Sequence, residues 1–308
     1  MNCQRLITYT LISTTLAIAN VAQAGSSAAF EFCDRNQTLS ASDQSTLLHL
    51  ASVVRQELAN SNSDIALISR SGLNLSRFNI RYSHAAIAWR ENNSNRWTAR
   101  QLYYACDEKR PRIYDQGLAG FVMGTDDPNK GYISIVPLPS NAATPLKHVA
   151  LDTPTYALNL LANNYSASAY AFGLEYQNCN QWVIELLATA WGNLSNHNKL
   201  RSNAQTWLKT KQYRPQPITI SSWLLLAAAF APLVHTNDHP EEDLQKRALH
   251  ISLPSDIETF IRQEFPNSPR IEICHNGQQA IVRHGWTTMD EDCTPTDPRD
   301  KSISFSTQ

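Results

Sequence analysis

Apolar residues recur at intervals of three and four along several stretches of this chain, the spacing of an amphipathic helix. One stretch follows a capping serine at position 40 or 42, a second covers residues 145–163, and the strongest runs from Cys179 to Trp191, where Gly192 ends it. A further apolar run, Trp223–Val234, has only 12 residues and contains a proline. A membrane span needs ~20 apolar residues, so this run predicts a buried helix.

Strand-forming residues occupy other parts of the chain and predict two hairpins. Ile80–Arg90 and Arg96–Ala105 flank a cluster of polar turn residues. Arg270–Cys274 and Gln279–Arg283 flank an Asn-Gly pair, which favours a tight turn. Single strands are predicted over residues 65–68 and 132–138, and a short helix over residues 118–123. Together these elements predict an α+β fold with antiparallel strands.

The first 24 residues have the pattern of a secretory signal peptide. Arg5 precedes a mostly apolar stretch, and Ala22-Gln23-Ala24 fits an A-x-A cleavage signal. Threonines and serines interrupt the apolar stretch, which argues against the alternative of a retained membrane anchor. We therefore expect cleavage after Ala24 and a periplasmic or secreted product with no stable membrane span.

The charge of the predicted mature chain excludes some partners. Without the signal peptide, 25 basic and 27 acidic residues remain, and no basic block stands out. This balance argues against nucleic acid and anionic membrane surfaces as partners. A cluster of acidic and histidine side chains over residues 235–243 is interpreted as a solvated loop, so neither a metal nor a cofactor is expected.

Five cysteines remain in an oxidising compartment, an odd number that leaves one thiol over. Cys274 and Cys293 lie close together across the second hairpin and its exit, so we expect them to pair. Cys33 and Cys106 are a second possible pair, although local placement alone does not fix the connectivity. On this pairing Cys179 is the free thiol.

Two short motifs suggest thiol chemistry. Cys179 stands at the start of the strongest helix, where backbone amides favour a thiolate and lower its pKa. A thiolate nucleophile needs an imidazole to carry its proton, and His84 lies on a predicted strand. The alternative for each residue alone is a buried structural role. A free thiol in an exported chain, combined with both contexts, favours a catalytic pair.

The motifs Tyr82-Ser83-His84-Ala85-Ala86-Ile87 and Asn178-Cys179-x-x-Trp182-Val183 resemble those of permuted papain-like enzymes, the NlpC-type and lecithin:retinol acyltransferase-like proteins. In those proteins the histidine also precedes the cysteine. The whole mature chain resembles the bacterial domain-of-unknown-function family 2145, through segments at residues 32–35, 100–108 and 176–182. The permuted papain-like resemblance implies an antiparallel sheet packed against the helix that bears Cys179. It also implies a domain over residues 25–215 and a C-terminal extension over 216–293 packed on it. The tail over residues 294–308 is polar and contains prolines, so we expect it to be disordered.

The same resemblance implies a third polar group that orients the imidazole. Gln101 is the first choice and Tyr103 the second, and neither is the acidic or histidine residue usual there. Gln177 and Asn178 are candidates for an oxyanion site, with helix capping as the alternative.

The expected function is an exported thiol hydrolase or acyltransferase that acts on an amide or ester. The expected substrate is a cell-wall peptide, with an acyl group derived from lipid as the alternative. The alternative is a non-catalytic periplasmic binding or assembly protein on a decayed papain-like fold.

Overall fold

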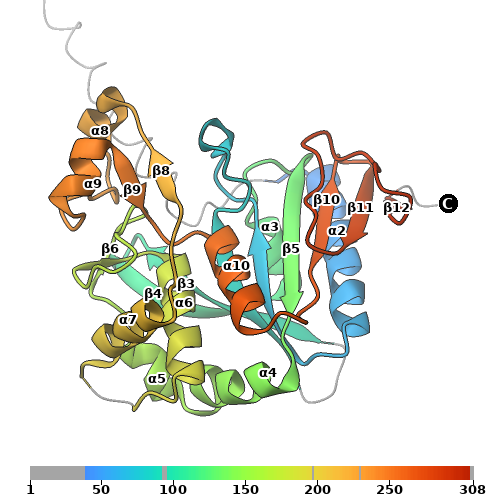
Figure 1. Ribbon diagram of the computed structural model, residues 1–308. Coiled ribbons are helices and arrows are strands. Elements are labelled where there is room, and N and C mark those ends of the chain that lie inside the picture. Colours follow the sequence, from blue (N-terminus) through green and yellow to red (C-terminus); the bar gives the residue numbers. More distant parts are fainter. Residues whose placement is uncertain (1–38, 92–95, 196–197, 229, 306–308) are drawn as a thin grey trace, which may run out of the picture.

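The computed structural model describes residues 39–305, apart from 92–95, 196–197 and 229. An eight-stranded sheet forms its centre, in the order β12-β11-β10-β5-β1-β2-β3-β4, and every adjacent pair is antiparallel (Figure 1). The strands are β1 (Ile65–Arg70), β2 (His84–Arg90), β3 (Trp97–Ala105), β4 (Arg110–Gly117), β5 (Gly131–Pro137), β10 (Ile271–His275), β11 (Gln279–His284) and β12 (Lys301–Ser304). The α+β prediction and both predicted hairpins are confirmed in this sheet.

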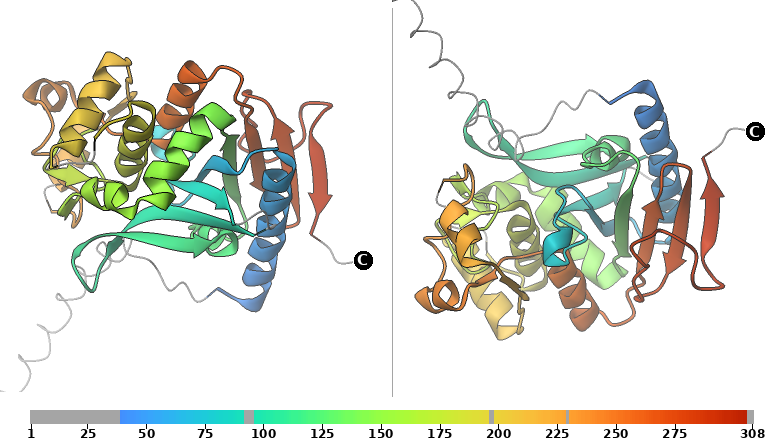
Figure 2. Two further views of the ribbon diagram at one scale, coloured as in Figure 1. Left: turned by 90° about the horizontal axis from the view of Figure 1, so that it is seen from below. Right: turned by 90° about the horizontal axis from the view of Figure 1, so that it is seen from above.

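Both faces of the sheet are covered by helices, because its central strands are buried on both sides. In β1, Ile65 and Leu67 face one core, whereas Ala66 and Ile68 face the other. The first core contains side chains of α4 (Ser140–Lys147), α5 (Pro154–Asn159), α6 (Cys179–Trp191), α7 (Leu200–Thr210) and α10 (Pro254–Glu264). The second contains side chains of α2 (Ala41–Asn60) and α3 (Leu118–Met123). Figure 2 shows the helices from two further directions.

One predicted helix is broken in the structure. Residues 145–163 do not form a continuous helix: α4 ends at Lys147, a π-helical turn covers His148–Asp152, and α5 begins at Pro154. Pro154 has no backbone N–H, so it suits the first turn of a new helix and not the interior of a long one.

The C-terminal part of the chain completes the central sheet. Strand β10 pairs with β5, so residues 271–284 join the same sheet as the N-terminal strands and do not form a separate layer. The prediction of a disordered tail is wrong for residues 294–305, since β12 pairs with β11. Arg283 forms an ion pair with Asp300 at 2.6 Å, and this contact holds the tail against the sheet edge.

The apolar run at residues 223–234 is not the buried helix that its composition predicted. Helix α8 (Ser222–Ala228) has no buried residue, and Trp223 is 73% exposed. It lies with β8 (Pro217–Thr219), α9 (Glu241–Lys246) and β9 (Ala248–His250) on the side of the molecule away from β12 (Figure 1). Within the described ranges, no helix is both long and apolar enough to cross a membrane.

The cysteines agree with the predicted pairing where the structure describes them. Cys274 and Cys293 form a disulfide with their Cα atoms 5.7 Å apart. Cys106 is also disulfide-bonded, but Cys33 and the predicted signal peptide lie outside the described residues. The Cys33–Cys106 pairing and cleavage after Ala24 therefore stay predictions. Among the described cysteines, only Cys179 is free.

Candidate thiol site

Helix α6 begins at Cys179 because the residue before it caps the helix. The Asn178 side chain accepts a hydrogen bond from the backbone N–H of Gln181 at 2.7 Å. An asparagine in this position satisfies one of the free amides of the first turn. Cys179 is 7% exposed, and the helix that it begins is buried along almost its whole length.

The helix start meets the sheet where β2 and β3 separate. These two strands pair only from Ile87↔Arg100 to Arg90↔Trp97, so the first part of β2 has no partner on that side. Asn180 takes the place of the missing strand: its Oδ1 accepts from the backbone N–H of Ala85 at 3.0 Å. Its Nδ2 donates to the carbonyl of Ser83 at 3.1 Å. One side chain of α6 thus holds the backbone on both sides of His84.

The Cys179 sulfur lies beside the same segment. Its contacts are with the carbonyl oxygen of Ser83 at 4.0 Å and with Oδ1 of Asn180 at 3.6 Å. No hydrogen bond joins the sulfur to the His84 ring, although both residues are described. The structure therefore brings the predicted cysteine next to the backbone of the predicted histidine without the expected sulfur–imidazole hydrogen bond.

The imidazole contacts both residues that were predicted to orient it. His84 Nε2 lies 2.8 Å from Oε1 of Gln101, and the Tyr103 ring stacks on the imidazole at 5.0 Å. Gln101 donates its amide to Oε1 of Gln116 at 2.6 Å, which turns its own carbonyl oxygen toward the ring. This arrangement assigns the proton to Nε2 of His84 and leaves Nδ1 as the basic nitrogen.

Burial dominates the titration of both groups. It lowers the pKa of His84 to about 3, an effect strengthened by the positive charge of Arg70 and opposed by the Gln101 hydrogen bond. Burial also raises the pKa of the Cys179 thiol to about 11, against Arg70 and nearby backbone amides. The predicted lowering of the thiol pKa is wrong for this state, because desolvation outweighs the helix amides. Both groups are neutral at pH 7.

The two oxyanion candidates have structural partners instead. Gln177 donates to the carbonyl of Leu160 at 2.9 Å and to Oε2 of Glu185 at 2.6 Å. Its Oε1 accepts from the N–H of Ala162 at 3.0 Å. Asn178 caps α6. The structure thus favours the capping alternative for Asn178 and gives Gln177 a buried structural role.

Sequence reasoning missed two residues of this site, Asn180 and Arg70. Asn180 is a polar residue in the first turn of a largely apolar helix, a signal that pattern analysis had available. Arg70 ends a strand of six fully buried positions and is only 5% exposed. Its position opposite His84 follows from the pairing of β1 with β2, which the local sequence does not reveal.

Replacement of Asn180 by alanine is expected to destabilise the protein by about 1–3 kcal/mol, since the buried N–H of Ala85 loses its acceptor. Asn180→Asp keeps that acceptor but turns a buried carboxylate oxygen toward the carbonyl of Ser83, so at pH 7 it should cost at least as much. Urea unfolding monitored by circular dichroism measures both losses. Equal stability of the Asn180→Ala variant and the unaltered protein would show that α6 does not depend on this contact.

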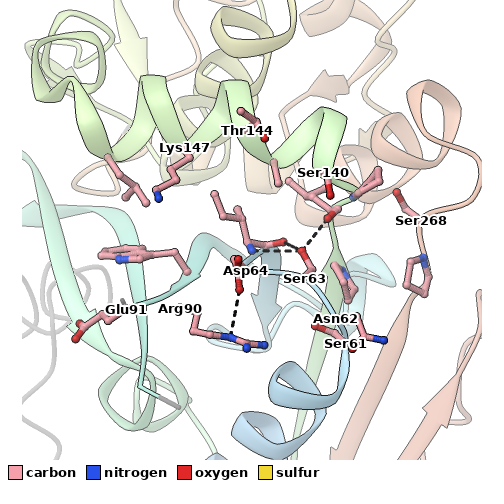
Figure 3. A pocket seen from close by; sticks show the side chains of 18 of the residues that line it. Ser61, Asn62, Ser63, Asp64, Arg90, Glu91, Ser140, Thr144, Lys147 and Ser268 are labelled. Atoms are coloured by element: carbon pink, nitrogen blue, oxygen red, sulfur yellow. Dashed lines mark hydrogen bonds and ion pairs between the residues drawn. The ribbon is translucent and has the colours of Figure 1, made fainter. Parts of the chain in front are cut away.

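Other polar clusters lie away from the thiol. No group of three or more potential metal ligands occurs among the residues that the structure describes, and His239 bonds the carbonyl of Ser168 at 2.7 Å. A hollow of about 990 Å³ lies at the opposite ends of β1 and β2, near the Asp64–Arg90 ion pair (Figure 3). None of its lining residues belongs to the thiol site.

Comparison with known proteins gives a family for this fold and site. Residues 57–261 match DUF2145, a family described as uncharacterized protein conserved in bacteria. The chain belongs to this family. The matched range includes Arg70, His84, Gln101, Cys179 and Asn180, and therefore both halves of the thiol site. No curated protein and no solved structure matches the chain.

Proposed function

We propose that this member of the DUF2145 family is an exported thiol hydrolase or acyltransferase with a permuted papain-like fold. Cys179 is the nucleophile and His84 the base. The observation that carries this proposal is the junction between the start of α6 and the open end of the β2–β3 hairpin. There a free cysteine lies beside the strand that carries an oriented imidazole.

The protonation states suit a mechanism that starts from a neutral pair. As the Cys179 sulfur attacks the carbonyl carbon of an amide or ester, its proton passes to Nδ1 of His84. The resulting imidazolium gives that proton to the leaving amine or alcohol, and an acyl thioester remains on Cys179. Water, or an acceptor amine or alcohol, then attacks the thioester and restores the thiol. Gln101 holds the ring in the required tautomer throughout.

The order of the motifs and the arrangement of the elements support the permuted architecture. His84 precedes Cys179 in the chain, and the helix of Cys179 packs against the strand of His84. The predicted export and the resemblance to NlpC-type proteins support a cell-wall peptide as the substrate. An acyl group derived from lipid is the other substrate class.

The second candidate function is non-catalytic binding or assembly on a decayed enzyme fold. Two observations favour it: burial raises the pKa of the thiol to about 11, and no hydrogen bond joins the sulfur to the imidazole. Both observations describe the protein without substrate, where catalytic hydrogen bonds are often long, so acylation of the thiol decides between the candidates.

Acylation of Cys179 distinguishes the two candidates. The mature protein is incubated with p-nitrophenyl acetate at pH 7.5, and the acetylated peptide that contains Cys179 is quantified by mass spectrometry. Urea-unfolded protein, in which the same thiol is an ordinary one, gives the reference rate. We expect the folded protein to react faster than this reference, and His84→Ala to slow acylation by ~10²-fold or more.

His148→Ala is the matched control, because His148 is exposed and distant in sequence from both motifs. This control should acylate at the rate of the unaltered protein. A folded protein that reacts more slowly than the unfolded reference, with no effect of His84→Ala, would favour the non-catalytic candidate instead.

A further inference from the structure

Arg70 is a buried cation that has no counter-charge among the residues the structure describes. Its side chain is only 5% exposed, and no carboxylate of the described residues lies within ion-pair distance of it. Its partners are neutral: Nη1 donates to the carbonyl of Gly124, and Nη2 donates to the Tyr103 hydroxyl at 3.1 Å. Its Nε has no hydrogen-bond partner. An unpaired buried charge is costly to the fold, which makes the surroundings of Arg70 a candidate for a functional role.

The fold makes space for this guanidinium with two glycines. A Cβ atom on Gly72 would lie 2.6 Å from Nη1, and one on Gly124 would lie 2.5 Å from Nη2. A side chain at either position would therefore force the guanidinium to shift. The third wall is the Phe121 ring, 5.4 Å from the guanidinium carbon. The slot fixes where the positive charge lies.

The slot that holds the Arg70 guanidinium lies beside the thiol site. Arg70 pairs with His84 in the ladder between β1 and β2, and its carbonyl accepts from the N–H of Ser83 at 3.1 Å. The carbonyl of Ser83 in turn contacts the Cys179 sulfur. Tyr103, which receives the Arg70 hydrogen bond, stacks on His84. The guanidinium thus contacts the side chain that packs on His84, and its positive charge acts to lower the pKa of the Cys179 thiol.

The other titratable groups around the sulfur are neutral at pH 7. His84 in β2 is an unprotonated imidazole, and burial raises the pKa of Tyr165, which interacts with Cys179 from β6 (Asn164–Tyr165). Tyr103 in β3 presents its hydroxyl to Arg70. Arg70 is therefore the charge that acts on the thiol from these elements.

We propose that Arg70 is the electrostatic partner of Cys179, a guanidinium held without a carboxylate from the described parts of the chain, so that it stabilises negative charge on the sulfur. The inference rests on the proposed function, in which that charge develops as the thiol attacks. Arg70 acts through Cys179 and is thus a positioning residue of the reaction rather than a catalytic one. The same cation helps to keep His84 unprotonated in the resting state.

The test measures thiol ionisation without any substrate. Alkylation of Cys179 by iodoacetamide is followed by peptide mass spectrometry between pH 7 and pH 10 in the folded mature protein. Arg70→Met removes the charge and keeps an unbranched apolar stem. It should slow alkylation by ~10-fold at each pH, which corresponds to an upward shift of about one pKa unit. Arg70→Lys keeps the charge and should recover most of the rate.

Gly124→Ala provides a second perturbation in a protein that retains Arg70. The added methyl group displaces the guanidinium, so alkylation should again slow while circular dichroism shows an intact fold. This variant decides the outcome if Arg70→Met does not fold. An alkylation profile in Arg70→Met, or in Gly124→Ala if it must stand alone, that equals the profile of the unaltered protein would overturn the inference.

Failure of this inference is distinguishable from failure of the proposed function. Normal acylation of Cys179 by p-nitrophenyl acetate, together with unchanged alkylation in Arg70→Met, would overturn only the role of Arg70. Absent acylation, together with slowed alkylation in Arg70→Met, would overturn only the proposed activity.

Discussion

Replacement of Glu185 by alanine is expected to destabilise the protein by about 3–5 kcal/mol, because it leaves a buried arginine without its counter-charge. Glu185 is fully buried in α6 and accepts from Nε of Arg201 at 2.9 Å. Gln177 and Gln205 donate to the same carboxylate at 2.6 and 2.8 Å. Arg201 also donates to the carbonyls of Gly173, Leu174 and Tyr176, so the network holds the loop that leads into Cys179.

Urea unfolding measures the loss, and Glu242→Ala is the matched control. Glu242 forms an exposed pair with Lys246, so its removal should change stability far less than the removal of Glu185. The alkylation rate of Cys179 should also change in Glu185→Ala, since the loop before α6 loses its anchor. The net value of one hydrogen bond is about 1 kcal/mol. If the free energy of unfolding of Glu185→Ala lies within that margin of the unaltered protein, Arg201 finds other partners.

Acid is expected to destabilise the protein through His275, a buried histidine of β10 whose two ring nitrogens have no partner. Burial lowers the pKa of His275 to about 4, against an attraction from Asp127. Because this pKa lies below the value of ~6.5 in the unfolded chain, the unfolded state binds the proton more tightly. The contribution of neutral His275 to the free energy of unfolding is therefore fully present above about pH 6.5. It is lost as the pH falls toward 4, by about 3 kcal/mol in total.

His275→Met removes the titrating group. Between pH 7 and pH 4 this variant should lose about 3 kcal/mol less of its free energy of unfolding than the unaltered protein does. Ile273→Val, a non-titrating change in the same strand, should lower stability equally at both pH values. Burial raises the pKa of Asp256 to about 6, an effect of opposite sign that all three proteins share and that cancels in the comparison. An unchanged slope in His275→Met would contradict the prediction.

The hydrophobic pattern by itself determined most local elements. The α6 helix is predicted almost residue for residue, because its apolar repeat, its capping asparagine and its terminal glycine agree. The two hairpins follow from polar turn residues between strand-forming stretches. Cys274–Cys293 follows from the closeness of the two residues to one hairpin. In each case the signal lies within about 20 residues, where chain geometry limits the alternatives.

Composition failed where a distant contact decided the outcome. The tail after Thr294 is polar and resembles disordered sequence, yet Arg283 and the free edge of β11 order it as a strand. The run at residues 223–234 is apolar enough for a core, but its helix has no buried residue. The local pattern predicts neither outcome, because the burial of a segment depends on which other parts of the chain pack against it.

The thiol site divides in the same way. The sequence by itself indicated that Cys179 begins a helix and that His84 lies on a strand, and the family resemblance offered Gln101 ahead of Tyr103 as the partner of the imidazole. Only the tertiary structure decided that Asn180 fills the gap between β2 and β3 and that Arg70 lies opposite His84. It also decided that the thiol pKa is raised, whereas local reasoning predicted that it is lowered. A helix start lowers a thiol pKa, but desolvation depends on every element packed around the sulfur, and here it is the larger effect.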